Sequence, residues 1–120
     1  MKLLDAMYSI ESAEGQQLRL QLHPEHEIYQ AHFPGNPITP GVCLVQIVAE
    51  LAGRQLQRNL TLQRVVNLKF TAPISPVETP RIDVTLASVS EADGCVKVKG
   101  TIAAADTGAV MTKYSLELKS

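Results

Sequence analysis

The sequence predicts an α+β fold, in which one long buried helix packs against a curved antiparallel sheet. Two observations predict it. Segments in which apolar and polar residues alternate, as in half-buried strands, gather after residue 60. The segment 41–57, in contrast, is apolar nearly all round, which is typical of a buried helix. The 120 residues contain no repeat and no low-complexity linker, so residues 1–120 are expected to form one domain.

The helix is expected to begin at Thr39-Pro40-Gly41, because proline is favoured in a first helical turn. After it, four alternating segments predict an antiparallel meander. The connectors 91–94 and 105–108 have the glycine of tight hairpin turns, whereas three prolines interrupt the connection 71–80. Another strand carries Leu18, Leu20 and Leu22, and a weaker one covers residues 6–12. The four later strands, with their expected core residues, are 65–70 (Val66, Leu68, Phe70), 82–89 (Ile82, Val84, Leu86), 96–104 (Val96, Val98, Ile102) and 110–118 (Val110, Tyr114, Leu116, Leu118).

Composition argues against several classes of protein. The net charge is −1 and only five residues are aromatic, so neither nucleic acid nor an anionic membrane is an expected partner. No apolar run approaches the roughly 18 residues that span a bilayer. The first residues are too few and too soon charged for a signal peptide, which predicts a cytoplasmic protein with reduced Cys43 and Cys95.

Two polar side chains interrupt the apolar helix. Gln46 and Glu50 are four residues apart and therefore share one face. A carboxylate that faces a protein interior destabilises the fold unless it is hydrogen-bonded or used. Glu50 is thus expected to cap a neighbouring backbone group, to pair with Arg54, or to belong to a functional site.

The segment before the helix favours a site. Residues 32–41 read His-Phe-Pro-Gly-Asn-Pro-Ile-Thr-Pro-Gly, a stiff loop that can hold the imidazole of His32 against the start of the helix. The N–H groups of a first helical turn lack intrahelical partners and can polarise a carbonyl oxygen. Histidine titrates near neutrality and can act as a base or an acid.

Residues 32–42 resemble the motif His-Phe-Pro-Gly-x-Pro-x-x-Pro-Gly-Val of the β-hydroxyacyl-ACP dehydratases, the FabZ and FabA group. Residues 28–31 before the motif and residues 66–74 after the helix also resemble that family, so that the resemblance covers residues 26–118. It implies a hot-dog fold that works as a homodimer or higher oligomer. Each site would combine the histidine of one chain with an acidic residue on the partner's helix.

The resemblance also implies the chemistry. His32 would remove the α-proton of a 3-hydroxyacyl thioester carried on the phosphopantetheine of an acyl carrier protein. The backbone N–H groups of Gly41 and Val42 would bind the thioester oxygen. A substrate tunnel would be lined by Phe33, Pro40 and Phe70, and neither a metal nor another cofactor would be needed.

At one position the sequence departs from the family. Fourteen residues after the histidine the family has an acid, and here that residue is Gln46; four residues later, where FabZ proteins have glutamine, stands Glu50. A carboxylate moved by four residues is displaced by about 5.4 Å along the helix. The exchange predicts slow dehydration that depends on Glu50 and increases when Gln46 is changed to glutamate.

Two other functions fit the same residues. A hot-dog thioesterase would hydrolyse the thioester with a water held by Gln46 or Glu50, and a non-catalytic subunit would bind acylated carrier protein without converting it. Cys43 could serve as a nucleophile, although its apolar neighbours favour packing. The segment 23–26 (His-Pro-Glu-His) is expected to be a solvated loop rather than a metal site. Arg54, Arg58 and Arg64 are candidates for contact with an acidic carrier protein.

Overall fold

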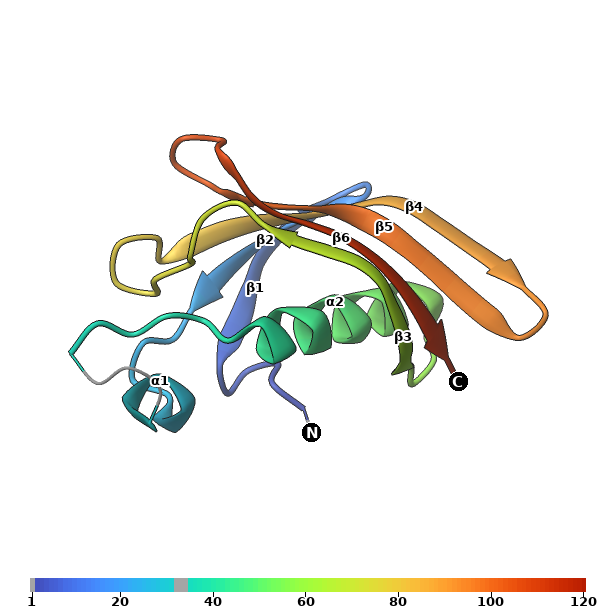
Figure 1. The fold of residues 1–120 in the computed structure, drawn as a ribbon, viewed down its shortest axis with the longest axis horizontal. Helices are drawn as coiled ribbons and strands as arrows, with labels where there is room; N and C mark the ends of the chain where they lie inside the picture. The colour runs from blue at the N-terminus through green and yellow to red at the C-terminus, as the bar shows by residue number, and fades with distance from the viewer. Residues whose placement is uncertain (1, 32–34) are drawn as a thin grey trace.

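The computed structural model describes residues 2–31 and 35–120 and contains one curved six-stranded antiparallel sheet with a long helix in its hollow (Figure 1). The predicted α+β hot-dog fold is therefore confirmed. A short helix, which the sequence analysis did not predict, precedes the long one. The elements are β1 (Tyr8–Glu14), β2 (Gln17–Leu22), α1 (Glu27–Ala31), α2 (Gly41–Leu56), β3 (Thr61–Phe70), β4 (Arg81–Ala92), β5 (Cys95–Ala104) and β6 (Val110–Lys119).

The strand order differs from a four-strand meander. β4, β5 and β6 follow one another as predicted, but the order across the sheet is β1-β2-β4-β5-β6-β3. β3 pairs with β6, and β2 occupies the other side of β4. The prediction that residues 65–70 pair with residues 82–89 is thus wrong.

The connection 71–80 explains this order. At its start the N–H of Thr71 donates to the carbonyl of Met111, on the β6 side, and at its end the carbonyl of Pro80 accepts from the N–H of Leu22, on the β2 side. The segment therefore crosses the end of the sheet. A tight hairpin would instead have placed β3 next to β4.

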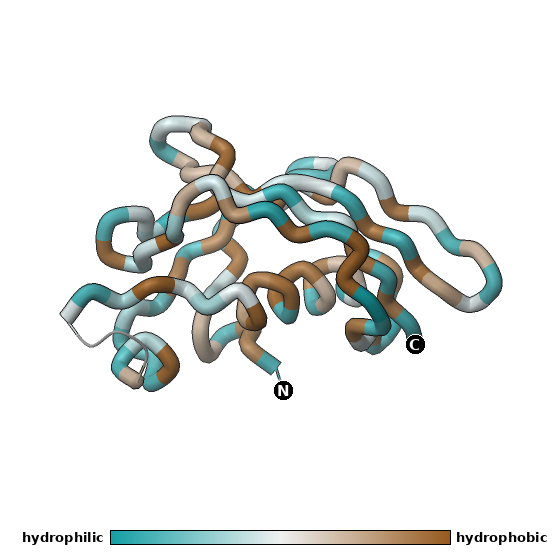
Figure 2. The backbone as a smooth tube through the Cα atoms, in the orientation of Figure 1, coloured by the Kyte–Doolittle hydropathy of each residue, from teal (hydrophilic) through white to brown (hydrophobic). Residues whose placement is uncertain are grey.

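Helix α2 forms the centre of the core. Its apolar side chains are buried against the inner faces of the strands, and brown segments of the hydropathy tube run along both (Figure 2). The helix begins after Pro40, which has extended backbone angles, and ends at Leu56; the C-cap residue Gln57 adopts the left-handed conformation at φ 57°. Its buried residues are Cys43, Leu44, Val45, Ile47, Val48, Ala49, Leu51, Ala52 and Gly53.

β3 is an exposed edge strand, not the half-buried strand that its alternation predicts. Only Leu68 is partly buried; Val66 is 48 % exposed and Phe70 52 % exposed. Within residues 2–31 and 35–120, β3 has a neighbouring strand on one side alone, so its other edge offers unpaired backbone groups. Val110, at the start of β6, is likewise 39 % exposed, whereas the other core residues predicted in β4, β5 and β6 are buried.

Two glycines are required by the sheet. Asp93 and Gly94 both have positive φ, as the predicted hairpin between β4 and β5 demands. In the middle of β5, a Cβ atom on Gly100 would lie 1.8 Å from the carbonyl oxygen of Thr85 and 2.5 Å from the hydroxyl of Tyr114. That hydroxyl donates a hydrogen bond of 2.7 Å to the same carbonyl. Gly100 therefore lets a tyrosine from β6 reach across β5 to β4.

Candidate active site

The entry to α2 is fixed by buried hydrogen bonds. Thr39 is buried; its hydroxyl is 2.8 Å from the hydroxyl of Tyr29 on α1, and its N–H donates to the carbonyl of Ile74. Burial raises the pKa of Tyr29 to about 12, so its phenol stays protonated and can keep this bond. α1, absent from the predicted elements, thus helps to hold the loop that precedes the helix.

The first turn of α2 presents backbone donors. The N–H groups of Cys43 and Leu44 donate to the carbonyl of Pro40 at 3.0 and 3.2 Å. The N–H groups of Gly41 and Val42 have no acceptor in residues 2–31 and 35–120. These are the two groups that the resemblance assigns to the thioester oxygen, and a helix N-terminus favours such a partner electrostatically.

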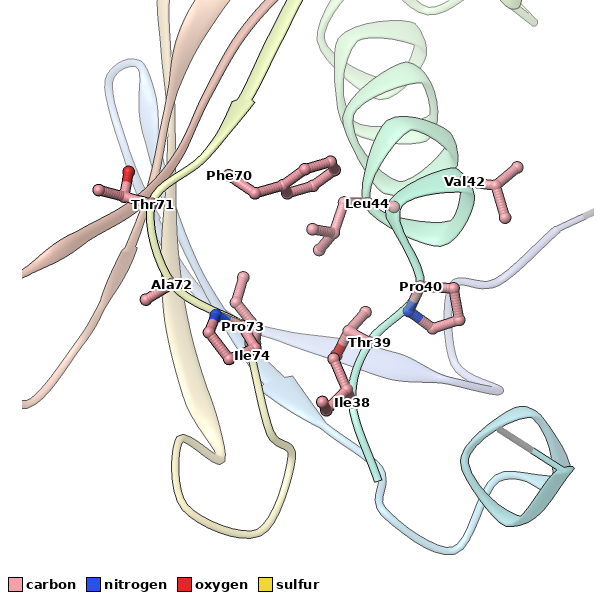
Figure 3. Close-up of a pocket in the computed structure, with 11 residues that line it drawn as sticks. Ile38, Thr39, Pro40, Val42, Leu44, Phe70, Thr71, Ala72, Pro73 and Ile74 are labelled. Atoms are coloured by element: carbon pink, nitrogen blue, oxygen red, sulfur yellow. The ribbon is translucent and has the colours of Figure 1, made fainter. Parts of the chain in front are cut away.

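An apolar cavity of about 500 Å³ opens beside this first turn (Figure 3). Four of the residues expected in an oxyanion site or a tunnel, Pro40, Gly41, Val42 and Phe70, line it together. Phe70 extends from the end of β3 toward the helix, and Leu44 and Ile74 are buried in the wall. The other lining residues are Ile38, Thr39, Thr71, Ala72 and Pro73.

Gly41 and Phe70 fit each other closely. A Cβ atom on Gly41 would lie 2.7 Å from Cζ of Phe70, so only glycine allows the ring to lie over the first turn in this position. The ring is half exposed and forms part of the cavity wall. Apolar walls next to unpaired backbone donors suit a ligand with a polar carbonyl and an aliphatic chain.

Gln46 and Glu50 line a different hollow, of about 620 Å³, on another side of α2. Neither residue lines the apolar cavity. Arg54 and Lys2 also contribute to this second hollow, which is consequently far more polar than the first. One chain therefore does not bring the helix N-terminus and the polar pair into one cavity.

Glu50 is held by four donors. Its Oε2 accepts from the N–H of Leu3 at 2.7 Å and from Nε2 of Gln46 at 2.9 Å. Its Oε1 accepts from the N–H of Leu4 and from the hydroxyl of Tyr8, both at 2.9 Å. The expected backbone cap is thus present, and within the part of the chain that the structure covers no ion pair joins Glu50 to Arg54.

The sequence did not reveal that the N–H groups of Leu3 and Leu4 donate to Glu50, because these residues lie 47 and 46 residues from it along the chain. Tyr8 is fully buried, and burial together with the nearby carboxylate of Glu50 raises the pKa of its phenol well above the ordinary value. The phenol therefore remains a donor throughout the physiological pH range.

Two of the predicted site residues, His32 and Phe33, lie outside the described residues. Cys43 is buried, and burial raises the pKa of its thiol, which argues against its use as a nucleophile. In the segment 23–26, the His23 ring lies 3.2 Å from the Ser9 hydroxyl and His26 accepts from the N–H of Ile28. Over the ranges described, no group of three or more His, Cys, Asp or Glu side chains could hold a metal ion.

Of the candidate carrier-binding arginines, Arg58 pairs with Glu91 at 2.7 Å and Arg64 lies 3.6 Å from Glu117. The side chain of Arg58 is 36 % exposed and that of Arg64 65 % exposed, so both cations remain accessible. Across residues 2–31 and 35–120 the structure contains no helix long and apolar enough to cross a membrane.

Comparison with known proteins identifies the family. The family model "ApeI-like: ApeI dehydratase" matches residues 9–107. A 3-hydroxyacyl-[acyl-carrier-protein] dehydratase FabZ from Latilactobacillus sakei is 30 % identical over 112 residues, which cover 85 % of this chain and 78 % of the relative. Two further FabZ proteins, 32 % and 28 % identical, are aligned over 56 % and 55 % of their own length.

Solved structures agree on the fold. The dehydratase heterocomplex ApeI:P from Xenorhabdus doucetiae has a chain that matches 92 % of this one, with a TM-score of 0.59 and 18 % identity. A thioesterase from Haemophilus influenzae matches 95 % of it, with a TM-score of 0.62 and 12 % identity. Since the fold is shared by both enzyme classes, the sequence matches decide between families. The chain belongs to the ApeI-like dehydratases, within the hot-dog family of β-hydroxyacyl-ACP dehydratases.

Proposed function

We propose that the protein is a 3-hydroxyacyl-ACP dehydratase, which removes water from a 3-hydroxyacyl thioester to give a trans-2-enoyl thioester in fatty acid or related acyl-chain biosynthesis. The observation that supports it best is the pair of backbone donors, Gly41 and Val42, which end the dehydratase motif and line an apolar cavity. A thioester oxygen on these donors would place the acyl chain along Phe70 and Leu44. No metal or other cofactor enters the scheme, and a cytoplasmic acyl carrier protein is the expected partner.

In the proposed reaction His32 takes a proton from the carbon next to the thioester. The negative charge that develops on the thioester oxygen is stabilised by the N–H groups of Gly41 and Val42. The C3–O bond then breaks, the double bond forms between C2 and C3, and the leaving oxygen takes up a proton to depart as water. Gln46 has no acidic proton to give, so we assign this proton to the imidazolium of His32. Lack of a separate acid makes the reaction slow, since general acid catalysis contributes on the order of a hundred- to ten-thousand-fold.

The proposed site is completed by a second copy of the chain. Within one chain the backbone donors and the polar pair Gln46 and Glu50 line separate hollows. We infer that the partner's helix brings its own polar pair to the apolar cavity across a two-fold axis. The open edge of β3, with its exposed valines, supplies a surface for such a partner.

Incubation with a 3-hydroxyacyl-ACP, or with its pantetheine mimic, tests the proposal when the products are identified by mass. We expect loss of one water and an enoyl thioester, and we expect His32→Ala to abolish this conversion without loss of folding. Release of a free acid would instead identify a thioesterase. A His32→Ala variant that kept most of the activity would contradict the mechanism.

A second candidate is a non-catalytic acyl-ACP-binding subunit that works beside an active homologue. The engagement of Glu50 with four donors favours it, because a carboxylate used in this way is a poor proton donor. Binding of the 3-hydroxyacyl carrier without any change in its mass, under conditions where a FabZ protein converts it, would identify this function.

A further inference from the structure

One buried hydroxyl group in the core has no hydrogen-bond partner. Thr112, in β6, is completely buried, and its Oγ1 neither donates nor accepts a hydrogen bond among the residues that the structure describes. The gap around this oxygen, between α2 and the sheet, is too narrow to hold a water molecule. A buried hydroxyl without a partner destabilises the fold, whereas valine would have the same shape at no such cost, so the hydroxyl requires a functional explanation.

The gap around Thr112 adjoins the apolar cavity beside the first turn of α2. Leu44 lines both the cavity and the gap. Phe70, in the cavity wall, is the direct cross-strand partner of Thr112, so the two side chains leave the same face of the sheet with their Cβ atoms about 5 Å apart. Leu44 and Phe70 point toward each other in the cavity (Figure 3). These two side chains therefore stand between the cavity and the hydroxyl.

The gap also continues the cavity in the direction that an acyl chain would take. A thioester oxygen on the N–H groups of Gly41 and Val42 leaves the chain to run along Leu44. The gap extends from Leu44 to Val48, which is one helical turn or about 6 Å further along α2. Its lining is otherwise apolar, and Thr112 is the lining residue whose polar side-chain atom lacks a partner. The other lining residues are Val45, Leu68, Ile102, Tyr114 and Leu116.

From this placement we propose that the protein acts on acyl chains that carry an oxygen atom beyond C3, and that the Thr112 hydroxyl donates a hydrogen bond to that oxygen. The inference rests on the proposed dehydratase function and names its substrate class. Entry of the chain requires Leu44 and Phe70 to turn aside, and the Phe70 ring, which is 52 % exposed, has room to do so. Without water to compete, a lone donor discriminates between a chain with an acceptor and a chain without one.

Binding of acyl pantetheines that lack the 3-hydroxyl, and therefore cannot be dehydrated, measures this preference. In a matched series one methylene beyond C3 is replaced by an ether oxygen, at successive positions along a chain of constant length. For one position of the oxygen, the dissociation constant of the wild type should lie about ten-fold below that of the all-methylene chain. Thr112→Val removes the donor at nearly constant shape and should reverse the preference, because the ether oxygen is then buried without a partner.

Two further variants are the matched controls. Thr112→Ser keeps a hydroxyl donor and should keep the preference within about three-fold of the wild type. Thr101→Val removes a hydroxyl from the outer face of the neighbouring strand β5, where it alternates with the buried Ile102, and should leave the preference unchanged. Melting temperatures of all variants are compared with that of the wild type, and that of Thr112→Val should be at or above it.

The inference would be overturned if no ether position bound more tightly than the all-methylene chain. It would also be overturned if Thr112→Val lowered the preference no more than Thr101→Val. A wild type that dehydrates alkyl substrates without any preference for the ether series would contradict the inference alone. A wild type that neither dehydrates nor binds any acyl pantetheine would refute the proposed function itself, and that result does not depend on the variants.

Discussion

At the scale of single residues, the exchange of acid and amide on α2 is the feature with the clearest chemical consequence. In the wild type the amide of Gln46 donates to Glu50, which already accepts three other hydrogen bonds. Any acid introduced at position 46 will therefore face a carboxylate that accepts hydrogen bonds from Leu3, Leu4 and Tyr8.

We predict that Gln46→Glu creates a neutral acid and accelerates dehydration. Two carboxylates at hydrogen-bond distance cannot both ionise, and the donors around Glu50 leave the proton on the new side chain, whose pKa is raised. Activity should rise by on the order of ten-fold or more and then fall as the pH passes the raised pKa. The pH–rate profile of the variant, compared with that of the wild type, measures both effects.

The free energy of unfolding of Gln46→Glu, relative to that of the wild type, should also decrease as the pH rises. A group whose folded-state pKa is raised contributes stability that is fully present below its unfolded pKa of about 4.3 and is lost as the pH rises through the folded value. The variant should therefore lose stability relative to the wild type on the alkaline side. If the difference in the free energy of unfolding between Gln46→Glu and the wild type did not vary with pH, the carboxylates at positions 46 and 50 would not be in contact in the variant.

The hydroxyl of Thr112 is a second residue with a measurable effect. Thr112 is completely buried in β6, and its Oγ1 has no hydrogen-bond partner in the described part of the chain. Thr112→Val removes this unsatisfied oxygen at nearly constant shape and should raise the free energy of unfolding by about 1 kcal/mol. Thr39→Val is the control: that hydroxyl is buried too but bonded to Tyr29, so its loss should destabilise by a similar amount. Urea unfolding measures the free energy of unfolding of both variants, which should increase for Thr112→Val and decrease for Thr39→Val.

At the scale of elements, local pattern predicted α2 and the inward faces of β4, β5 and most of β6, because burial repeats along the chain with the period of the element. Local pattern did not predict the position of β3 in the sheet. That position depends on the pairing of β3 with β6, which is distant in sequence. The burial of β3 was overestimated for the same reason. The structure brings Pro40, Gly41, Val42 and Phe70, which were expected in an oxyanion site or a tunnel, to one cavity, whereas the N-terminal donors to Glu50 have no local signal.

Within the sheet, we predict that Gly100→Ala is strongly destabilising. The added methyl group would collide with the Thr85 carbonyl and with the Tyr114 hydroxyl, and a central strand cannot move away without breaking its own pairing. A loss of about 2–3 kcal/mol in the free energy of unfolding is expected. Lys99→Ala, on the exposed face of the same strand, should change it by less than about 0.5 kcal/mol.

At the scale of the whole molecule, we predict a two-fold dimer that uses the edge of β3. Light scattering at micromolar concentration should give the mass of two chains or a multiple of it, and Val66→Lys, which places a charge on the exposed edge, should shift the protein toward one chain. Because the proposed site needs residues of both chains, the dehydration activity of Val66→Lys should fall as the fraction of dimer falls. A wild-type mass of one chain would contradict both the dimer and the shared site.

The sheet order also has a consequence for synthesis on the ribosome. β3 is made before β4, β5 and β6, yet among the described strands it pairs with β6 alone, which emerges after both other strands. Until then its valines have no strand to pair with, and a nascent chain that pauses after β5 exposes them together with the vacant edge of β5. Domains that delay a pairing in this way are open to association with neighbouring nascent chains. For a protein whose partner is proposed to be another copy of itself, that interval on a polysome is one in which neighbouring incomplete copies both have two unpaired β3 edges.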